Sequence, residues 1–150
     1  MTDLNAFDLQ ARHYIYDVCL RRGQPPSVAE LSYSLDASAE QVGNALEKLA
    51  DARMIVLQKD SGEILMANPF SAVPTSFAVE TPKFSCCGNC IWDSLGIAAM
   101  LHQDVAIKTS CADCGRALEV KIINEQVHGD EGLIHFAIPA HHWWDDIVFT

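Results

Sequence analysis

The chain has 150 residues, of which 49% are hydrophobic and 20% are charged, a balance typical of a globular protein rather than a disordered one. Its formal net charge is −10, with ten acidic and six basic residues in positions 1–67 and ten acidic and four basic residues in positions 68–150. An acidic surface repels polyanions, which disfavours nucleic-acid binding, and no apolar run approaches the roughly 18 residues needed to cross a bilayer.

The first 67 residues have the pattern of three helices followed by a β-hairpin. Apolar periodicity predicts the first helix, with Cys19 beside the apolar stripe as a small buried residue. Capping boxes predict the next two helices, and two β-rich runs around a turn predict the hairpin. This order predicts a winged-helix-like domain over residues 1–67. The expected elements are a helix over 5–21, helices starting at Ser27 and Ser38, and strands over 54–58 and 63–67.

Winged-helix domains commonly bind DNA, but the helix that would enter the major groove is acidic here. Glu40, Glu47 and Asp51 outnumber Lys48 on it. Because phosphate backbones attract basic rather than acidic surfaces, we predict a packing or dimerisation module at this end of the chain.

After an expected linker at residues 68–74, the pattern changes to short strands around one helix, predicted over residues 91–101. Runs of strands with a single helix between them indicate an α+β domain with a mostly antiparallel or mixed sheet. We therefore predict a second domain over residues 75–150. Its expected strands cover residues 76–80, 105–109, 117–123 and 133–138.

The residues best suited to chemistry lie at the start of the helix predicted over 91–101. If this helix begins near Asn89 or Cys90, the Cys90 thiol lies at the positive end of the helix dipole, which favours the thiolate. Asp93 follows three positions later and therefore lies on the same face. The alternative is structural: Asp93 stabilises the first turn, and Cys90 is a buried thiol.

Three segments of the second half resemble the alkylmercury lyases in their order and spacing. The resemblance covers residues 75–150, and a winged-helix-like N-terminal domain is also a trait of that family. The matching segments are Thr75–Glu80, Asn89–Leu95 and the pair Ser110-Cys111 ahead of a predicted strand.

This resemblance implies an enzyme that cleaves the carbon–mercury bond of small organomercurials. It implies Cys90 as the mercury-binding thiol and Asp93 as the proton donor to the leaving carbon. It implies no organic cofactor, since mercury(II) belongs first to the substrate and then to the product, and it implies a mercuric reductase as the partner that receives the ion.

The implied reaction sets a requirement on Asp93. Mercury(II) is soft and prefers thiolate ligands, whereas the carbon needs a proton from an acid. Asp93 must therefore stay protonated well above the usual aspartate pKa near 4. We expect desolvation by apolar neighbours such as Trp92 and Leu95 to raise its pKa.

The sequence departs from the family near its C-terminus. The lyases use a second thiol just past a segment that residues 141–150 resemble, and this chain ends at Thr150 without it. The alternatives are that Cys86, Cys87 or Cys111 stands in for it, that the lyase activity is lost, or that the chain is cut short, for example at a selenocysteine codon read as a stop.

A rival prediction comes from cysteine spacing alone. Cys87, Cys90, Cys111 and Cys114 form a C-x2-C-x20-C-x2-C pattern, which is typical of structural zinc sites. A closed zinc site would occupy Cys90 and leave a non-catalytic interaction or regulatory module. In the lyase interpretation, Cys111 and Cys87 are instead the candidate helper thiols.

The N-terminus has no basic segment leading into an apolar stretch, so we expect no secretion signal and a cytoplasmic protein. We expect neither nucleic-acid nor membrane binding. The sequence does not define the oligomeric state.

Overall fold

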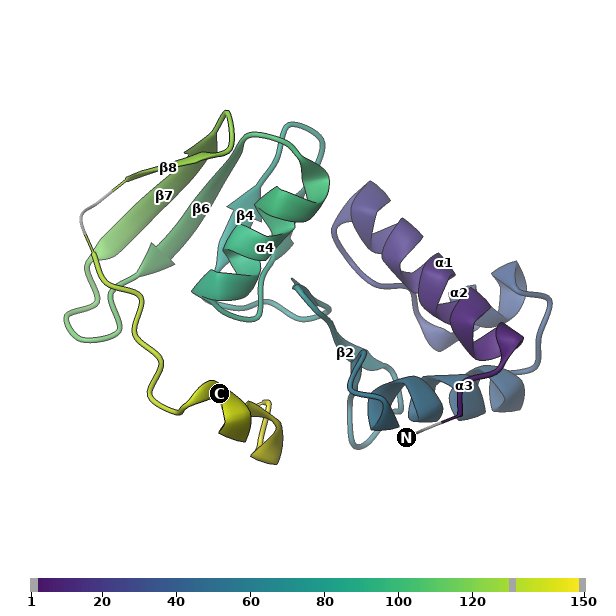
Figure 1. The fold of residues 1–150 in the computed structure, drawn as a ribbon. Helices are drawn as coiled ribbons and strands as arrows, with labels where there is room; N and C mark the ends of the chain where they lie inside the picture. Colours follow the sequence, from purple (N-terminus) through teal and green to yellow (C-terminus); the bar gives the residue numbers. More distant parts are fainter. Residues whose placement is uncertain (1–2, 130–131, 149–150) are drawn as a thin grey trace.

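A computed structural model describes residues 3–129 and 132–148 (Figure 1). The fold is α+β: three helices and a small sheet precede a larger sheet that carries one helix. The helices are α1 (Ala6–Arg22), α2 (Val28–Ser34), α3 (Ala39–Asp51) and α4 (Ile91–Leu101), with a 3-10 helix at Ala140–Asp145. The strands are β1 (Val56–Leu57), β2 (Ile64–Ala67), β3 (Phe70–Ser71), β4 (Ala78–Glu80), β5 (Ser85–Cys87), β6 (Val105–Ser110), β7 (Ala117–Ile123) and β8 (Gln126–Gly129).

Capping boxes explain where the first three helices begin. Ser27 and Ser38 start α2 and α3 as predicted, each accepting the backbone N–H of the third helical residue. Asn5 and Asp8 start α1 in the same way with a different residue pair. The predicted order of three helices and an antiparallel β1–β2 hairpin is present, and the likeness of this part to a winged helix stays a prediction.

The two groups of elements share one hydrophobic core. Ile15 of α1 belongs to the same buried cluster as Val79 of β4 and Ile97 of α4. The end of α1 lies very close to β5. Gly23, the C-cap of α1 with φ +77°, leaves no room for a side chain, because a Cβ there would lie 2.6 Å from the Cβ of Cys86. The helical part therefore packs directly against the elements that follow it.

The segment expected as a linker, residues 68–74, contains strand β3. This strand pairs with β2, with Met66 opposite Ser71. Phe70 is fully buried and forms a bridge to Gly88. Residues 70–71 of this connection are thus paired and buried, because the large apolar side chain of Phe70 enters the core.

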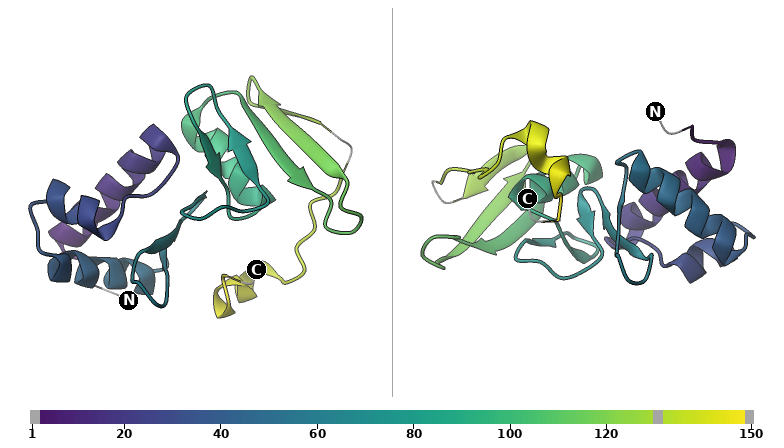
Figure 2. Two further views of the ribbon diagram at one scale, coloured as in Figure 1. Left: turned by 180° about the vertical axis from the view of Figure 1, so that it is seen from behind. Right: turned by 90° about the horizontal axis from the view of Figure 1, so that it is seen from below.

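The larger sheet is antiparallel, with strand order β5-β4-β6-β7-β8, and α4 lies across it over β4 (Figures 1 and 2). Within residues 132–148 the structure has no strand, so the prediction of a strand over 133–138 is wrong. Leu133 there is 98% exposed. The place beside β7 is instead taken by β8, after a tight turn in which Asn124 and Glu125 both have positive φ, as type I′ hairpins require.

No helix among residues 3–129 and 132–148 is both long enough and apolar enough to cross a bilayer.

Candidate active site

Helix α4 begins at a cysteine. Cys90 is its N-cap residue, with extended backbone, and the Cys90 Sγ accepts the backbone N–H of Asp93 at 3.4 Å. Serine, threonine, aspartate or asparagine usually fills this position, because a side-chain oxygen satisfies a free N–H at the helix start. Here a sulfur does so, which holds the Cys90 thiol against the first turn of α4 and close to Asp93.

A half-buried amide, that of Asn89, holds the Asp93 carboxyl group. Asn89 Nδ2 donates to Asp93 Oδ2 at 2.9 Å, to Asn68 Oδ1 at 3.1 Å and to the Pro69 carbonyl at 3.3 Å. The Tyr16 hydroxyl of α1 in turn donates to the Asn68 carbonyl at 3.0 Å. The carboxyl is therefore tied to α1 and to the segment before β3, a network that no local sequence pattern indicates.

Burial shifts the titration of both candidate residues toward their protonated forms. It raises the pKa of the Asp93 carboxyl, an increase that the Asn89 hydrogen bond partly opposes. It also raises the pKa of the Cys90 thiol, which the hydrogen bond from the Asp93 N–H does not offset. The predicted increase for Asp93 is thus present, whereas the prediction of a readily ionised Cys90 is wrong because desolvation outweighs the helix start.

An aromatic cluster flanks the first turn of α4. Trp92 is 58% exposed, and its ring meets Phe136 edge-to-face with centroids 6.3 Å apart. Phe136 packs on Trp143, with centroids 5.0 Å apart. The neighbouring Trp144 ring lies under the Arg53 guanidinium, 5.5 Å away. The C-terminal segment (yellow in Figure 1) therefore contacts both α4 and Arg53, which follows the C-cap of α3.

The four cysteines predicted as a zinc set do not meet at one point. Cys87 ends β5, Cys90 starts α4, and Cys111 and Cys114 lie between β6 and β7; all are free thiols. In the part of the chain that the structure describes, no three His, Cys, Asp or Glu side chains are placed to hold one metal ion. The four-thiolate cage is thus not formed here, and zinc binding stays a prediction.

The strand register nevertheless brings Cys90 and Cys111 to the same end of the larger sheet. Ala78 of β4 is opposite both Cys87 of β5 and Lys108 of β6. Since both neighbours run antiparallel to β4, they run in the same direction. Three further residues lead from Cys87 to Cys90 and from Lys108 to Cys111.

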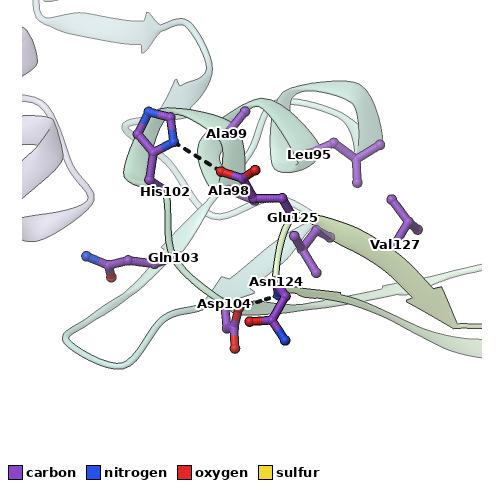
Figure 3. Close-up of a pocket in the computed structure, with 10 residues that line it drawn as sticks. Leu95, Ala98, Ala99, His102, Gln103, Asp104, Asn124, Glu125 and Val127 are labelled. Carbon is purple, nitrogen blue, oxygen red and sulfur yellow. Dashed lines mark hydrogen bonds and ion pairs between the residues drawn. The ribbon is translucent and has the colours of Figure 1, made fainter.

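A pocket of about 630 Å³ lies elsewhere, between α4 and the β7–β8 hairpin (Figure 3). His102 and Glu125 approach to 3.6 Å in it, and both are largely exposed. Its α4 residues begin at Leu95 and continue toward the end of the helix, so neither Cys90 nor Asp93 lines it. The candidate active site is therefore the start of α4, where Cys90 and Asp93 share one helical turn.

The chain is similar to one known protein family and to a solved structure. Residues 70–150 match the sequence profile of a family described as MerB: Alkylmercury lyase. Among solved structures, the crystal structure of the mercury-bound form of MerB2 matches with a TM-score of 0.63 and 23% identity, a likeness that shows the fold. The match covers 84% of this chain and 60% of that chain, so the chain spans only part of its solved relative. No curated protein matches.

Proposed function

Because the chain belongs to the alkylmercury lyase family, we propose that it cleaves the carbon–mercury bond of small organomercurials by protonolysis. Cys90 binds mercury through sulfur, and Asp93 gives a proton to the leaving carbon. The observation that carries the proposal is the shared first turn of α4, where the Cys90 Sγ accepts the Asp93 N–H at 3.4 Å.

The proposed reaction has two steps. In the first, the Cys90 thiol displaces a ligand from mercury, loses its proton to that ligand and forms a sulfur–mercury bond, which suits a soft metal. In the second, the Asp93 carboxylic acid transfers its proton to the carbon as the carbon–mercury bond breaks. The products are a hydrocarbon, mercury(II) on the Cys90 sulfur and an Asp93 carboxylate, whose negative charge balances the metal.

The surroundings of Asp93 support this role. Burial raises its pKa, which keeps a proton available at higher pH than for an exposed aspartate. The 2.9 Å hydrogen bond from Asn89 fixes one carboxyl oxygen, and a fixed acid needs less reorganisation during proton transfer.

The aromatic cluster of Trp92, Phe136 and Trp143 supports an organic substrate. An exposed apolar surface beside a thiol can accommodate the hydrocarbon group, because burying apolar area is favourable. We further propose that the reaction takes place in the cytoplasm and that a mercuric reductase receives the ion.

The test follows hydrocarbon release from an organomercurial by reduced, metal-free protein. Cys90→Ser keeps a good N-cap but replaces soft sulfur by hard oxygen, so it should lose hydrocarbon release. Asp93→Asn should still bind the organomercurial and release hydrocarbon about 10²–10⁴-fold more slowly. Asp51→Asn, at an exposed position in α3, is the matched control and should behave as the wild type.

Two results would contradict the proposal. One is unchanged hydrocarbon release from Asp93→Asn, which would remove the acid from the reaction. The other is a wild-type protein that binds the organomercurial tightly and releases no hydrocarbon, which indicates sequestration.

A further inference from the structure

Two thiols that the site at α4 does not contain lie together in the turn between β6 and β7. The Cys111 N–H donates to the Arg116 carbonyl at 2.8 Å, and the Gly115 N–H donates to the Cys111 carbonyl at 2.9 Å. Gly115 has φ +70°, a conformation that glycine adopts without strain. These bonds close a tight turn that carries Cys111 and Cys114.

The turn directs hydrogen-bond donors at one sulfur. The backbone N–H groups of Cys114 and Asp113 and the Cys114 thiol all lie near the Cys111 sulfur, so the turn brings the two thiols together. Cys114 is exposed and Cys111 is partly exposed. Backbone donors stabilise a negatively charged sulfur, which is the form that binds metals.

The number of ligands selects the kind of metal. The turn offers two thiols, and among residues 3–129 and 132–148 no third cysteine, histidine or carboxylate is placed to complete the set. Structural zinc is usually held by four ligands. Soft ions such as mercury(II) and copper(I) favour thiolates and can bind two of them in a line.

We propose that Cys111 and Cys114 form a second metal site, separate from Cys90, which holds one soft, thiol-preferring ion between two thiolates. With mercury(II), two S–H bonds are replaced by two sulfur–mercury bonds, two protons leave, and no electron is transferred. The site does not depend on the lyase reaction. If the proposed function holds, the shared sheet end of Cys90 and Cys111 gives the released ion a nearby acceptor.

The test uses a mercury(II) salt alone, with no organomercurial, on a reduced Cys87→Ser/Cys90→Ser protein. After desalting in excess glutathione, elemental analysis should find one mercury ion per chain. Adding Cys114→Ser should remove this ion, because loss of a tethered second ligand lowers the apparent affinity by about 10²–10⁴-fold. Circular dichroism checks that each variant is folded.

Several outcomes would overturn the second site. Mercury lost already in Cys87→Ser/Cys90→Ser would show that the turn cannot hold the ion. Mercury retained after Cys111→Ser and Cys114→Ser are both added to that variant would place the ion elsewhere. Zinc retained in the same assay, or gel filtration showing an ion shared between two chains, would contradict two-thiolate binding within one chain. Since no hydrocarbon is measured, failure of the lyase proposal leaves this result unaffected.

Discussion

Replacing glycine by alanine should have opposite effects at two positions of this chain. At Gly88, a Cβ would lie 2.8 Å from the backbone nitrogen of Ser94 and 3.1 Å from its Cα, and would also meet its Oγ. Backbone atoms cannot rotate away, so the first turn of α4 must move. At Gly43, in the middle of α3, a Cβ would meet nothing within 4 Å.

These contacts set the expected free energies. Forcing an extra methyl group into a packed site costs about 1–3 kcal/mol, and Gly88→Ala should lower the free energy of unfolding by this amount. An open helical glycine is about 0.5–1 kcal/mol less favourable than alanine, so Gly43→Ala should raise the free energy of unfolding.

Urea unfolding of both variants beside the wild type measures the two shifts, and an unchanged m-value shows that the denatured state is not the cause. Gly88→Ala should also slow hydrocarbon release, because Ser94 donates from its N–H and its hydroxyl to the Cys90 carbonyl, both at 3.0 Å. Displacing Ser94 therefore displaces the candidate thiol. A Gly88→Ala protein as stable and active as the wild type would refute the reasoning.

Three further predictions concern charged and polar side chains. The hydrogen-bonded Arg22 lowers the pKa of Glu30 from 4.5 to about 2, so the stabilisation is present above pH 4.5 and is lost as the pH falls toward 2. Arg22→Gln should flatten this acid dependence of Tm and, since both side chains are nearly half exposed, cost only about 0.5 kcal/mol at neutral pH. Tyr16→Phe removes the single hydroxyl donor that two backbone carbonyls share and should cost about 1–3 kcal/mol; an unchanged urea midpoint would exclude this. Burial raises the pKa of Asp93 above 3.8, so its contribution to stability is complete below pH 3.8 and is lost as the pH rises through the raised pKa. Asp93→Asn should therefore stabilise the protein more at alkaline than at acidic pH, and wild-type hydrocarbon release should fall as the pH rises; equal Tm shifts at both pH values would contradict this.

Local signals predicted the helices well because each helix start depends on a few adjacent residues. The capping boxes at Ser27 and Ser38 both form. Strands were harder to predict from the sequence than helices, because strand pairing depends on partners distant in sequence. The run over 133–138 has apolar residues suited to a strand but finds no partner, whereas β5 and β8 lie in segments whose composition did not predict strands.

In the candidate site, too, local features were predicted from the sequence, whereas features that depend on distant residues were not. The three-residue spacing of Cys90 and Asp93 predicted that both lie in one helical turn, and the Cys90 sulfur accepts the Asp93 backbone N–H there. The pKa of Cys90 depends on burial, which spacing does not reveal, and here the prediction was wrong. The support from Tyr16 joins groups 52 residues apart, so no local pattern could indicate it.

The hydrogen-bond network of Asn89 includes residues that lie outside the segment matching the family profile. The family match begins at residue 70, yet Asn68 and Pro69, two of the three acceptors of the Asn89 amide, lie before it, and Tyr16 lies in the first helix. A fragment cut at the homology boundary would leave this amide with Asp93 alone. Joining residues 70–150 to a different N-terminal domain would therefore change the hydrogen bonds that position the Asp93 carboxyl group.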